Sequence, residues 1–364
     1  MKKLFYFAAA AVALAACAKN EVVPVNSGEN QEITFNVAPK TKADPDEHGH
    51  NEFGKGNKFA SWAYYLGPNK TWKDNSADAK EYISGATISY NTTEKVWKAD
   101  KSYYWPKDGG KLTFFAYSLN KGDMDLISDN KSTSEFTCTW NNGVTGHIDL
   151  QLNPNTDFLV AEIAKDKTSN VTTHFTDGVP TLFKHRLSSV VFAIKTGANY
   201  ADKAFKLTGI TVHNLSHYGV YGQLPTESFS ASGTKYNPVF TSTAQDITYQ
   251  TDFVGVTGVN ESIFIPQEFE KGSDDKTNAY IEVKYTITTK VGTDEHGADI
   301  VVKEDVTKQI FLNPEDGKGT KMFDSWEMGK KYTINLTFTL GEILWDPAVL
   351  DWADVTPAAG QDIA

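Results

Sequence analysis

The residue best suited to carry chemistry is Cys17, which ends the sequence Leu14-Ala15-Ala16-Cys17. Lys2 and Lys3 precede it, followed by an apolar run that is too short to span a bilayer as a helix. This is the pattern of a secretory signal that ends in a bacterial lipobox, in which the cysteine is acylated and becomes the mature N-terminus.

We therefore predict a signal peptide over residues 1–16, a palmitate-type lipid anchor on Cys17 and a flexible tether over residues 17–31. An ordinary cleaved signal with an incidental cysteine is the alternative. The second cysteine, Cys138, lies in an alternating run and is interpreted as a small strand residue, without a disulfide partner once Cys17 carries lipid.

Two further clusters are candidates for binding. His48 and His50 stand in an acidic loop, a pattern that suits either a metal ion or a solvated surface, and we favour the solvated surface. Lys184, His185 and Arg186 form a basic cluster that can bind an anion or face solvent at a strand end, and we favour the strand end.

Enzyme signatures are not found in the sequence. It contains no phosphate-binding glycine loop, no Gly-x-Ser-x-Gly elbow and no His-Glu-x-x-His helix. We expect neither an enzyme nor a bound cofactor or metal. The net charge of −11, which becomes −13 without Lys2 and Lys3, argues against nucleic acid as a partner.

The elements that position these residues are short strands. Glu32 to Val37 alternates polar and apolar residues, which predicts a half-buried strand with Ile33, Phe35 and Val37 on the buried face. Many similar runs follow, separated by Gly, Asn and Asp clusters and by polar loops such as 226–245, with no long helical period. This pattern predicts an all-β protein of antiparallel sandwiches.

A Gly-Pro turn at residues 178–180 precedes a fresh strand pattern and suggests a domain boundary. We predict an N-terminal β-sandwich domain over residues 32–177, a C-terminal β-sandwich domain over 178–354 and a tail over 355–364. The 364 residues are enough for two such domains.

Aromatic residues are dense between residues 62 and 105. Such rings are usually core or cross-strand pairs, but exposed faces of Trp72 and Trp97 would form a sugar-stacking platform. The alternative function is therefore a surface glycan-binding lipoprotein that does not polymerise.

Several short motifs span nearly the whole mature chain: Lys19-Asn20-Glu21, Ile33-Thr34-Phe35, Tyr104-Trp105-Pro106 with Leu112 to Tyr117, Asp157 to Ala161, Phe183-Lys184-His185 with Leu187-Ser188, Ile265-Pro266-Gln267, and Trp326, Gly329 and Tyr332 through Asp351-Trp352. Taken in order, they resemble the fimbrillin family of Bacteroidia, the pilins of the type V pilus.

The resemblance implies two tandem transthyretin-like antiparallel β-sandwich domains, displayed as a lipoprotein on the outer membrane. It implies a structural or adhesive fimbrium subunit whose partners are other pilus subunits and a host protein or glycan receptor. A stalk, anchor or tip position stays open.

The resemblance also implies assembly by strand exchange, in which a protease removes the first strand and a neighbour's strand replaces it. The family pattern implies cleavage after arginine, whereas this loop offers Lys40 and Lys42. Either a lysine-tolerant protease acts here or the chain is never trimmed. The predicted donor lies in the C-terminal strands, with Ile334, Leu336, Phe338 and Ile343 as its apolar residues.

Overall fold

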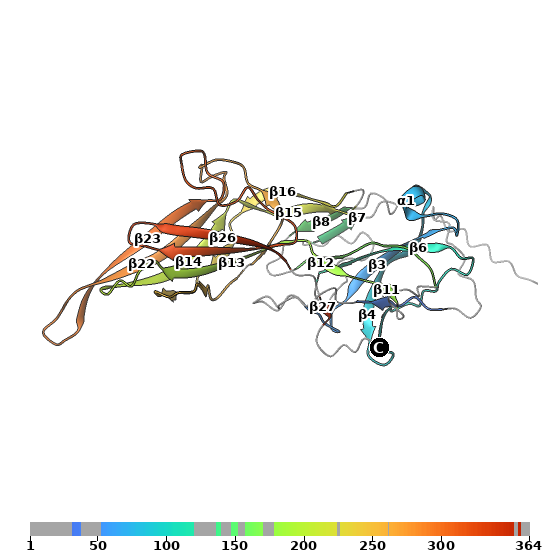
Figure 1. The fold of residues 1–364 in the computed structure, drawn as a ribbon, viewed down its shortest axis with the longest axis horizontal. Helices are drawn as coiled ribbons and strands as arrows, with labels where there is room; N and C mark the ends of the chain where they lie inside the picture. Colours follow the sequence, from blue (N-terminus) through green and yellow to red (C-terminus); the bar gives the residue numbers. More distant parts are fainter. Residues whose placement is uncertain are drawn as a thin grey trace, which may run out of the picture.

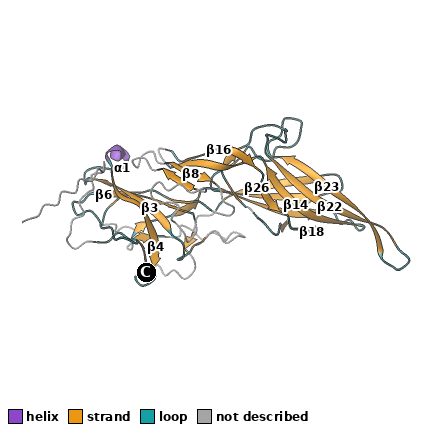
Figure 2. Ribbon diagram, turned by 180° about the vertical axis from the view of Figure 1, so that it is seen from behind, coloured by secondary structure: helices purple, strands orange, loops and turns teal. Residues whose placement is uncertain are grey.

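The computed structural model describes residues 31–37, 52–119, 136–139, 147–151, 157–169, 178–223, 226–260, 262–352 and 356–357. Within these ranges the protein is almost entirely β, and only α1 (Trp72–Asn75) and η1 (Ser76–Asp78) are helical. The described part of the chain is elongated, with the N-terminal strands at one end and a long C-terminal hairpin at the other (Figures 1 and 2). The predicted all-β fold is confirmed.

The N-terminal unit is a nine-stranded sheet in the order β11-β1-β5-β4-β3-β6-β9-β12, with β10 paired to β6. Phe35 on β1 and Phe114 on β6 lie several strands apart in this order, yet their ring centroids are 5.8 Å apart. The sheet therefore folds over on itself and encloses a core. Its strands are β1 (Phe35–Asn36), β3 (Phe59–Leu66), β4 (Lys80–Asn91), β5 (Val96–Ala99), β6 (Lys111–Ser118), β9 (Leu159–Ala161), β10 (Ala164–Lys167), β11 (Val179–Pro180) and β12 (Phe183–His185).

The C-terminal unit is a sandwich of two five-stranded sheets. The first contains β13 (Ser188–Thr196), β19 (Val254–Gly255), β20 (Ile263–Phe264), β25 (Lys330–Phe338) and β26 (Ile343–Asp351). The second contains β14 (Lys203–His213), β17 (Val239–Thr241), β18 (Gln245–Ile247), β22 (Tyr280–Thr293) and β23 (Asp299–Phe311). Tyr285 of one sheet and Phe338 of the other pack edge to face at 5.0 Å, so the sheets stack face to face.

A third sheet joins the two ends of the molecule. Its order is β16-β15-β8-β7, made of β7 (Phe136–Thr139), β8 (His147–Gln151), β15 (Leu215–Gly222) and β16 (Ser228–Tyr236). The β8 and β15 strands pair antiparallel although they come from opposite halves of the chain. Two small ladders complete the pairing, β2 (Glu52–Phe53) with β27 (Thr356–Pro357) and β21 (Gln267–Glu268) with β24 (Ser325–Trp326).

Three features differ from the sequence prediction. The predicted boundary at residue 178 falls inside the first sheet, because β11 and β12 follow it and β13 begins only at Ser188. The predicted polar loop 226–245 contains β16 and β17. The sheets are not purely antiparallel, because β25 runs parallel to β13 from Ser189↔Lys331 to Thr196↔Phe338.

We predict that the central strand β25 and the edge strand β26 of the first C-terminal sheet differ sharply in their tolerance of side-chain truncation. Leu336 on β25 is 0% exposed, whereas Leu344 on the edge strand β26 is 49% exposed. Leu336→Ala should lower the free energy of unfolding by about 2–5 kcal/mol. Leu344→Ala should change it by no more than about 0.5 kcal/mol. Urea denaturation measures both, and equal losses would contradict this placement.

Candidate assembly site

The first described segment, residues 31–37, is buried on one face. Ile33, Phe35 and Val37 are 2%, 3% and 4% exposed, and the residues between them are only half-buried. Phe35 packs against Phe59 and Phe114 at centroid distances of 5.5 and 5.8 Å. Each buried apolar side chain contributes about 1.5–3 kcal/mol. The alternation expected from the sequence is present here.

The backbone of this segment is hydrogen-bonded on both sides. On one side, the Ile33 amide donates to the Tyr103 carbonyl at 2.7 Å, and Phe35 pairs antiparallel with Trp97 of β5. On the other side, the amides of Val179 and Thr181 donate to the Thr34 and Asn36 carbonyls, each at 2.8 Å. Pro180 lies between these two donors, where the parallel ladder requires no amide from it.

We call the space that residues 31–37 occupy the strand slot, bounded by residues 103–105 with β5 on one side and by β11 on the other. Removing the segment would leave backbone groups unpaired along both boundaries and uncover Phe59 and Phe114. Such a vacancy binds an extended strand, because one strand satisfies both rows of polar groups and covers the apolar floor.

Gly178 fits against the slot because it has no side chain. Its φ is +140°, and a Cβ there would lie 2.8 Å from the carbonyl carbons of both Thr34 and Phe35. Any other residue would have to push the first segment away from β11. Glycine thus permits the close approach of the two backbones.

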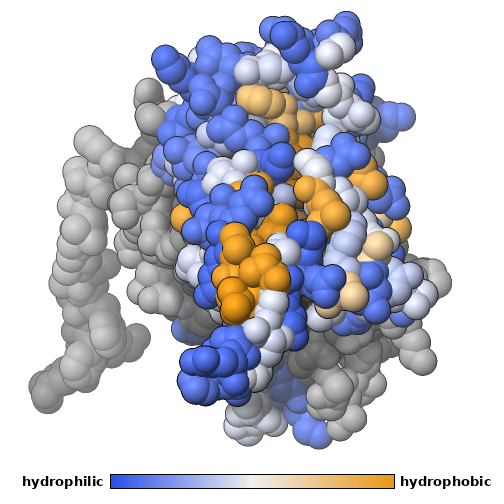
Figure 3. All heavy atoms as spheres, turned by 90° about the vertical axis from the view of Figure 1, so that its left-hand side faces the viewer, coloured by the Kyte–Doolittle hydropathy of each residue, from blue (hydrophilic) through white to orange (hydrophobic). Residues whose placement is uncertain are grey.

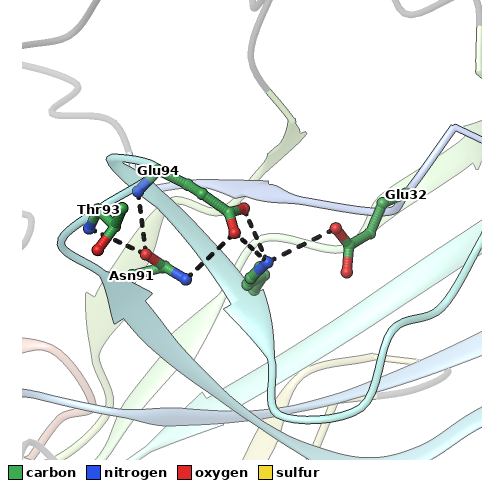
Figure 4. Close-up of polar contacts among 5 residues, drawn as sticks. Glu32, Asn91, Thr93 and Glu94 are labelled. Carbon is green, nitrogen blue, oxygen red and sulfur yellow. Dashed lines mark hydrogen bonds and ion pairs between the residues drawn. The ribbon is translucent and has the colours of Figure 1, made fainter.

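A surface ion cluster attaches the start of the segment to β5. The Lys98 ammonium lies 2.7 Å from Glu94 and 3.7 Å from Glu32, and the Asn91 carboxamide accepts from the amides of Thr93 and Glu94 (Figure 4, in which Lys98 is unlabelled). The hydrogen bond that Lys98 donates to the Glu94 carboxylate raises the pKa of Lys98. Exposed ion pairs contribute little to the free energy of folding. The cluster therefore orients the Glu32 side chain but adds little to the binding of residues 31–37.

The predicted donor residues divide between two different strands. Ile334, Leu336 and Phe338 are all 0% exposed on β25, which is hydrogen-bonded to β13 on one side and β26 on the other. Ile343 lies on β26, the last strand in the order of that sheet. β25 is thus a central strand of its own sandwich, and β26 is an edge strand.

The edge strand β26 carries apolar residues at period two. Ile343, Trp345, Pro347 and Val349 share one face, and Ile343 is 5% exposed, while Val349 is 47% exposed. On the opposite face, Leu344 and Leu350 are 49% and 67% exposed. The strand is therefore apolar on both faces and only partly covered.

The end of β26 is attached to the first sheet. The Trp352 ring stacks on His185 of β12 at a centroid distance of 3.8 Å and an interplanar angle of 5°. His185 Nδ1 lies 2.6 Å from a carboxylate oxygen of Asp157, and both side chains are buried. Further along, β27 adds in parallel to β2 near the N-terminal sheet (Figure 1).

The basic cluster does not form an anion site. Lys184 pairs with Glu162 at 2.9 Å, and Arg186 pairs with Glu227 at 2.5 Å. The Tyr221 hydroxyl also donates a hydrogen bond to Glu227. Burial is the main cause that raises the pKa of Tyr221, and the negative charge of Glu227 is the second. The favoured solvent-facing interpretation is wrong for His185, which is 1% exposed.

The tryptophans suspected of binding sugar are buried. Trp72 and Trp97 are each 4% exposed, and Trp72 packs on Phe115 and Trp97 on Phe59. The rings belong to the cores on the two faces of the N-terminal sheet. The two tryptophans that suggested a glycan-binding platform are therefore core residues.

Several predicted site residues lie outside the described residues: Cys17, Lys40, Lys42, His48 and His50. Cys138 lies on β7 and pairs with Ile148. Among the residues that the structure describes, no group of three His, Cys, Asp or Glu side chains is arranged to hold a metal. The described helical residues include no stretch long and apolar enough to cross a membrane.

The geometry defines a class of protein: an all-β protein of sandwich units, in which the first described strand is hydrogen-bonded to a neighbour along each of its two edges. The family follows from a sequence match, in which a family model described as fimbrillin-like covers residues 41–352. This chain belongs to the fimbrillin-like family.

One solved structure shares this fold. A fimbrial protein from Bacteroides vulgatus superposes with a TM-score of 0.63 at 16% identity, covering 89% of this chain and 100% of that one. The tip fimbrial protein of Porphyromonas gingivalis, solved with a C-terminal truncation, gives a TM-score of 0.38 at 10% identity, covering 88% of this chain and 100% of that one. No curated protein sequence matches this chain.

We predict that Gly178→Ala loosens the first segment. The added Cβ meets the Thr34 and Phe35 backbone, and the positive φ adds strain of order 1–3 kcal/mol. Amide hydrogen exchange at Ile33, Val179 and Thr181 should accelerate by about tenfold or more. Gly341→Ala is the control, because nothing lies within 4 Å of its added Cβ. Unchanged exchange in Gly178→Ala would show that the segment does not depend on this contact.

Proposed function

We propose that this protein is a structural or adhesive subunit of a cell-surface fimbria that assembles by strand exchange. The observation that carries the proposal is the pairing of residues 31–37 on both sides of the strand slot. Cleavage at Lys40 or Lys42 would cut this segment from the body of the protein. A cut segment is held only by noncovalent contacts, and it loses the high effective concentration of a tethered strand.

We propose β26 as the donor and retain Ile343 from the predicted set. Withdrawal of β25 would break its ladders with β13 and β26 and remove Ile334, Leu336 and Phe338 from their own core. Withdrawal of β26 would break only its ladder with β25 among the described strands. β26 has nine residues and is therefore longer than the segment 31–37 that it would replace. Ile343, Trp345 and Pro347 recur at the same period as Ile33, Phe35 and Val37.

We further propose that the chain is exported as an outer-membrane lipoprotein acylated at Cys17. The lipobox sequence supports this step. The N-terminus found on the cell surface would then distinguish a stalk subunit from an anchor or tip subunit. A stalk subunit would start at Thr41 or Ala43 on the cell surface, after trimming. An anchor or tip subunit that is never trimmed would keep lipidated Cys17.

Limited tryptic digestion tests the exchange. Mass spectrometry should find cleavage after Lys40 or Lys42, and the trimmed protein should form ladders that resist mild denaturant in gel electrophoresis. The Lys40→Gln/Lys42→Gln double variant is the matched control and should stay monomeric under the same digestion. A trimmed wild-type protein that remains monomeric would rule out strand exchange for this chain.

A further inference from the structure

The C-terminal hairpin of β22 and β23 extends past the rest of the sandwich. The two strands pair from Tyr280↔Phe311 at the base to Thr293↔Asp299 near the tip. In Figures 1 and 2 the tip forms one end of the long axis of the molecule. The base covers the sandwich core, where Ile310 is 5% exposed, whereas the outer half projects beyond the other described strands (Figure 1).

The outer half is apolar and exposed on both faces. On β23, Ile300, Val301 and Val302 are 48%, 43% and 55% exposed. Figure 3 looks at this end of the molecule and shows apolar side chains gathered behind a hydrophilic tip. Exposed β-branched residues in succession are unusual on a monomer surface and typically mark a contact surface.

β23 also has a free edge. It is the last strand in the order β17-β14-β22-β23, so one side of its backbone pairs with no described strand. Edge strands usually carry charges or proline that prevent pairing with another chain. Here Asp299 and Lys303 flank an uninterrupted Ile300-Val301-Val302.

We propose that this edge binds a second copy of the same chain, with the two β23 strands antiparallel and related by a twofold axis at Val301. Directly opposed residues in such a pair must point to the same face. With the axis at Val301, Val301 faces its own counterpart, Ile300 faces Val302 of the second copy, and Asp299 faces Lys303 of the second copy. Apolar residues then meet apolar residues, and opposite charges meet at both ends.

The neighbouring registers lack this complementarity. An axis at Val302 opposes Ile300 to Glu304 and Asp299 to Asp305. An axis at Ile300 opposes Val301 to Asp299 and Lys303 to Gly297. Charge complementarity within the strand therefore selects the axis at Val301, and the contact is isologous.

The contact is small, so the pair forms weakly in dilute solution. It gains strength where many copies stand side by side, because each added contact is then effectively intramolecular. The surface thus suits lateral association of displayed copies. It involves neither the strand slot nor β26, and it does not depend on strand exchange.

Sedimentation equilibrium of the untrimmed mature chain tests the pairing. The wild-type protein should associate reversibly as concentration rises. Lys303→Asp places Asp299 against an aspartate at both ends of the pair, and Asp299→Lys places two lysines together. Each variant alone should associate about tenfold more weakly or worse, since both ends change from attraction to repulsion. An equimolar mixture of the two variants should regain association, because opposite charges then meet at both ends.

Val291→Lys is the matched control, because it adds a charge to the same hairpin away from the free edge and should leave association unchanged. Asp299 also pairs with Lys290 of its own chain at 2.5 Å, so circular dichroism checks that the Asp299→Lys variant is folded. A wild-type protein that stays monomeric at every concentration would overturn the proposal. Equal association of both single variants and the wild type would overturn it as well.

Discussion

The structure depends on one strand position that is paired from both sides. Residues 31–37 lie between residues 103–105 with β5 and the much later β11, so the N-terminal sheet is continuous only while they are in place. The β5 wall and the apolar floor of the slot keep their own support without the segment, because β5 pairs with β4, and Phe59 and Phe114 lie on the paired strands β3 and β6. β11, in contrast, is the end strand of the described sheet and pairs there with β1 alone. A vacancy at this position would therefore keep one wall and its floor, and an incoming strand would have to pair with β11 again.

The C-terminal sandwich distributes its strands in a complementary way. β25 lies at the centre, parallel to β13, and fills the core with residues that are fully buried. This leaves β26 at the edge, where it contributes Ile343 and Trp345 to a core that β25 already closes. The stack of Trp352 on His185 then connects the end of β26 to the N-terminal sheet, so any release of β26 must first separate these two rings.

Local pattern in the sequence was enough to predict the strands that bury one face. The alternation of Ile33, Phe35 and Val37, and of Ile334, Leu336 and Phe338, corresponds to burial in the structure. The order of strands was not predictable in this way, because β11 reaches β1, and β8 reaches β15, across long stretches of chain. β16 alternates only weakly, with Phe229 and Ala231 among serines that are typical of loops, and β23, exposed along most of its length, lacks the apolar alternation on which such predictions rest.

Side-chain partners were the least accessible part of the prediction. Lys184, His185 and Arg186 form a simple basic cluster in the sequence, but each finds a different carboxylate contributed by a distant segment. The tryptophans had the composition of a sugar platform, and only their burial assigns them to the cores. Likewise, a choice between β25 and β26 as the proposed donor strand required their central and edge positions, which the sequence does not reveal.

The central claim is that a strand from another copy can occupy the slot now filled by residues 31–37. An electron cryo-microscopy map of the trimmed, assembled protein tests it most directly, because Trp345 of β26 would be visible as a large side chain. The account predicts density for β26 of a neighbouring copy between β5 and β11, with Ile343, Trp345 and Pro347 facing Phe59 and Phe114. A map in which the chain's own residues 31–37 still fill the slot, or in which the slot is closed, would contradict it.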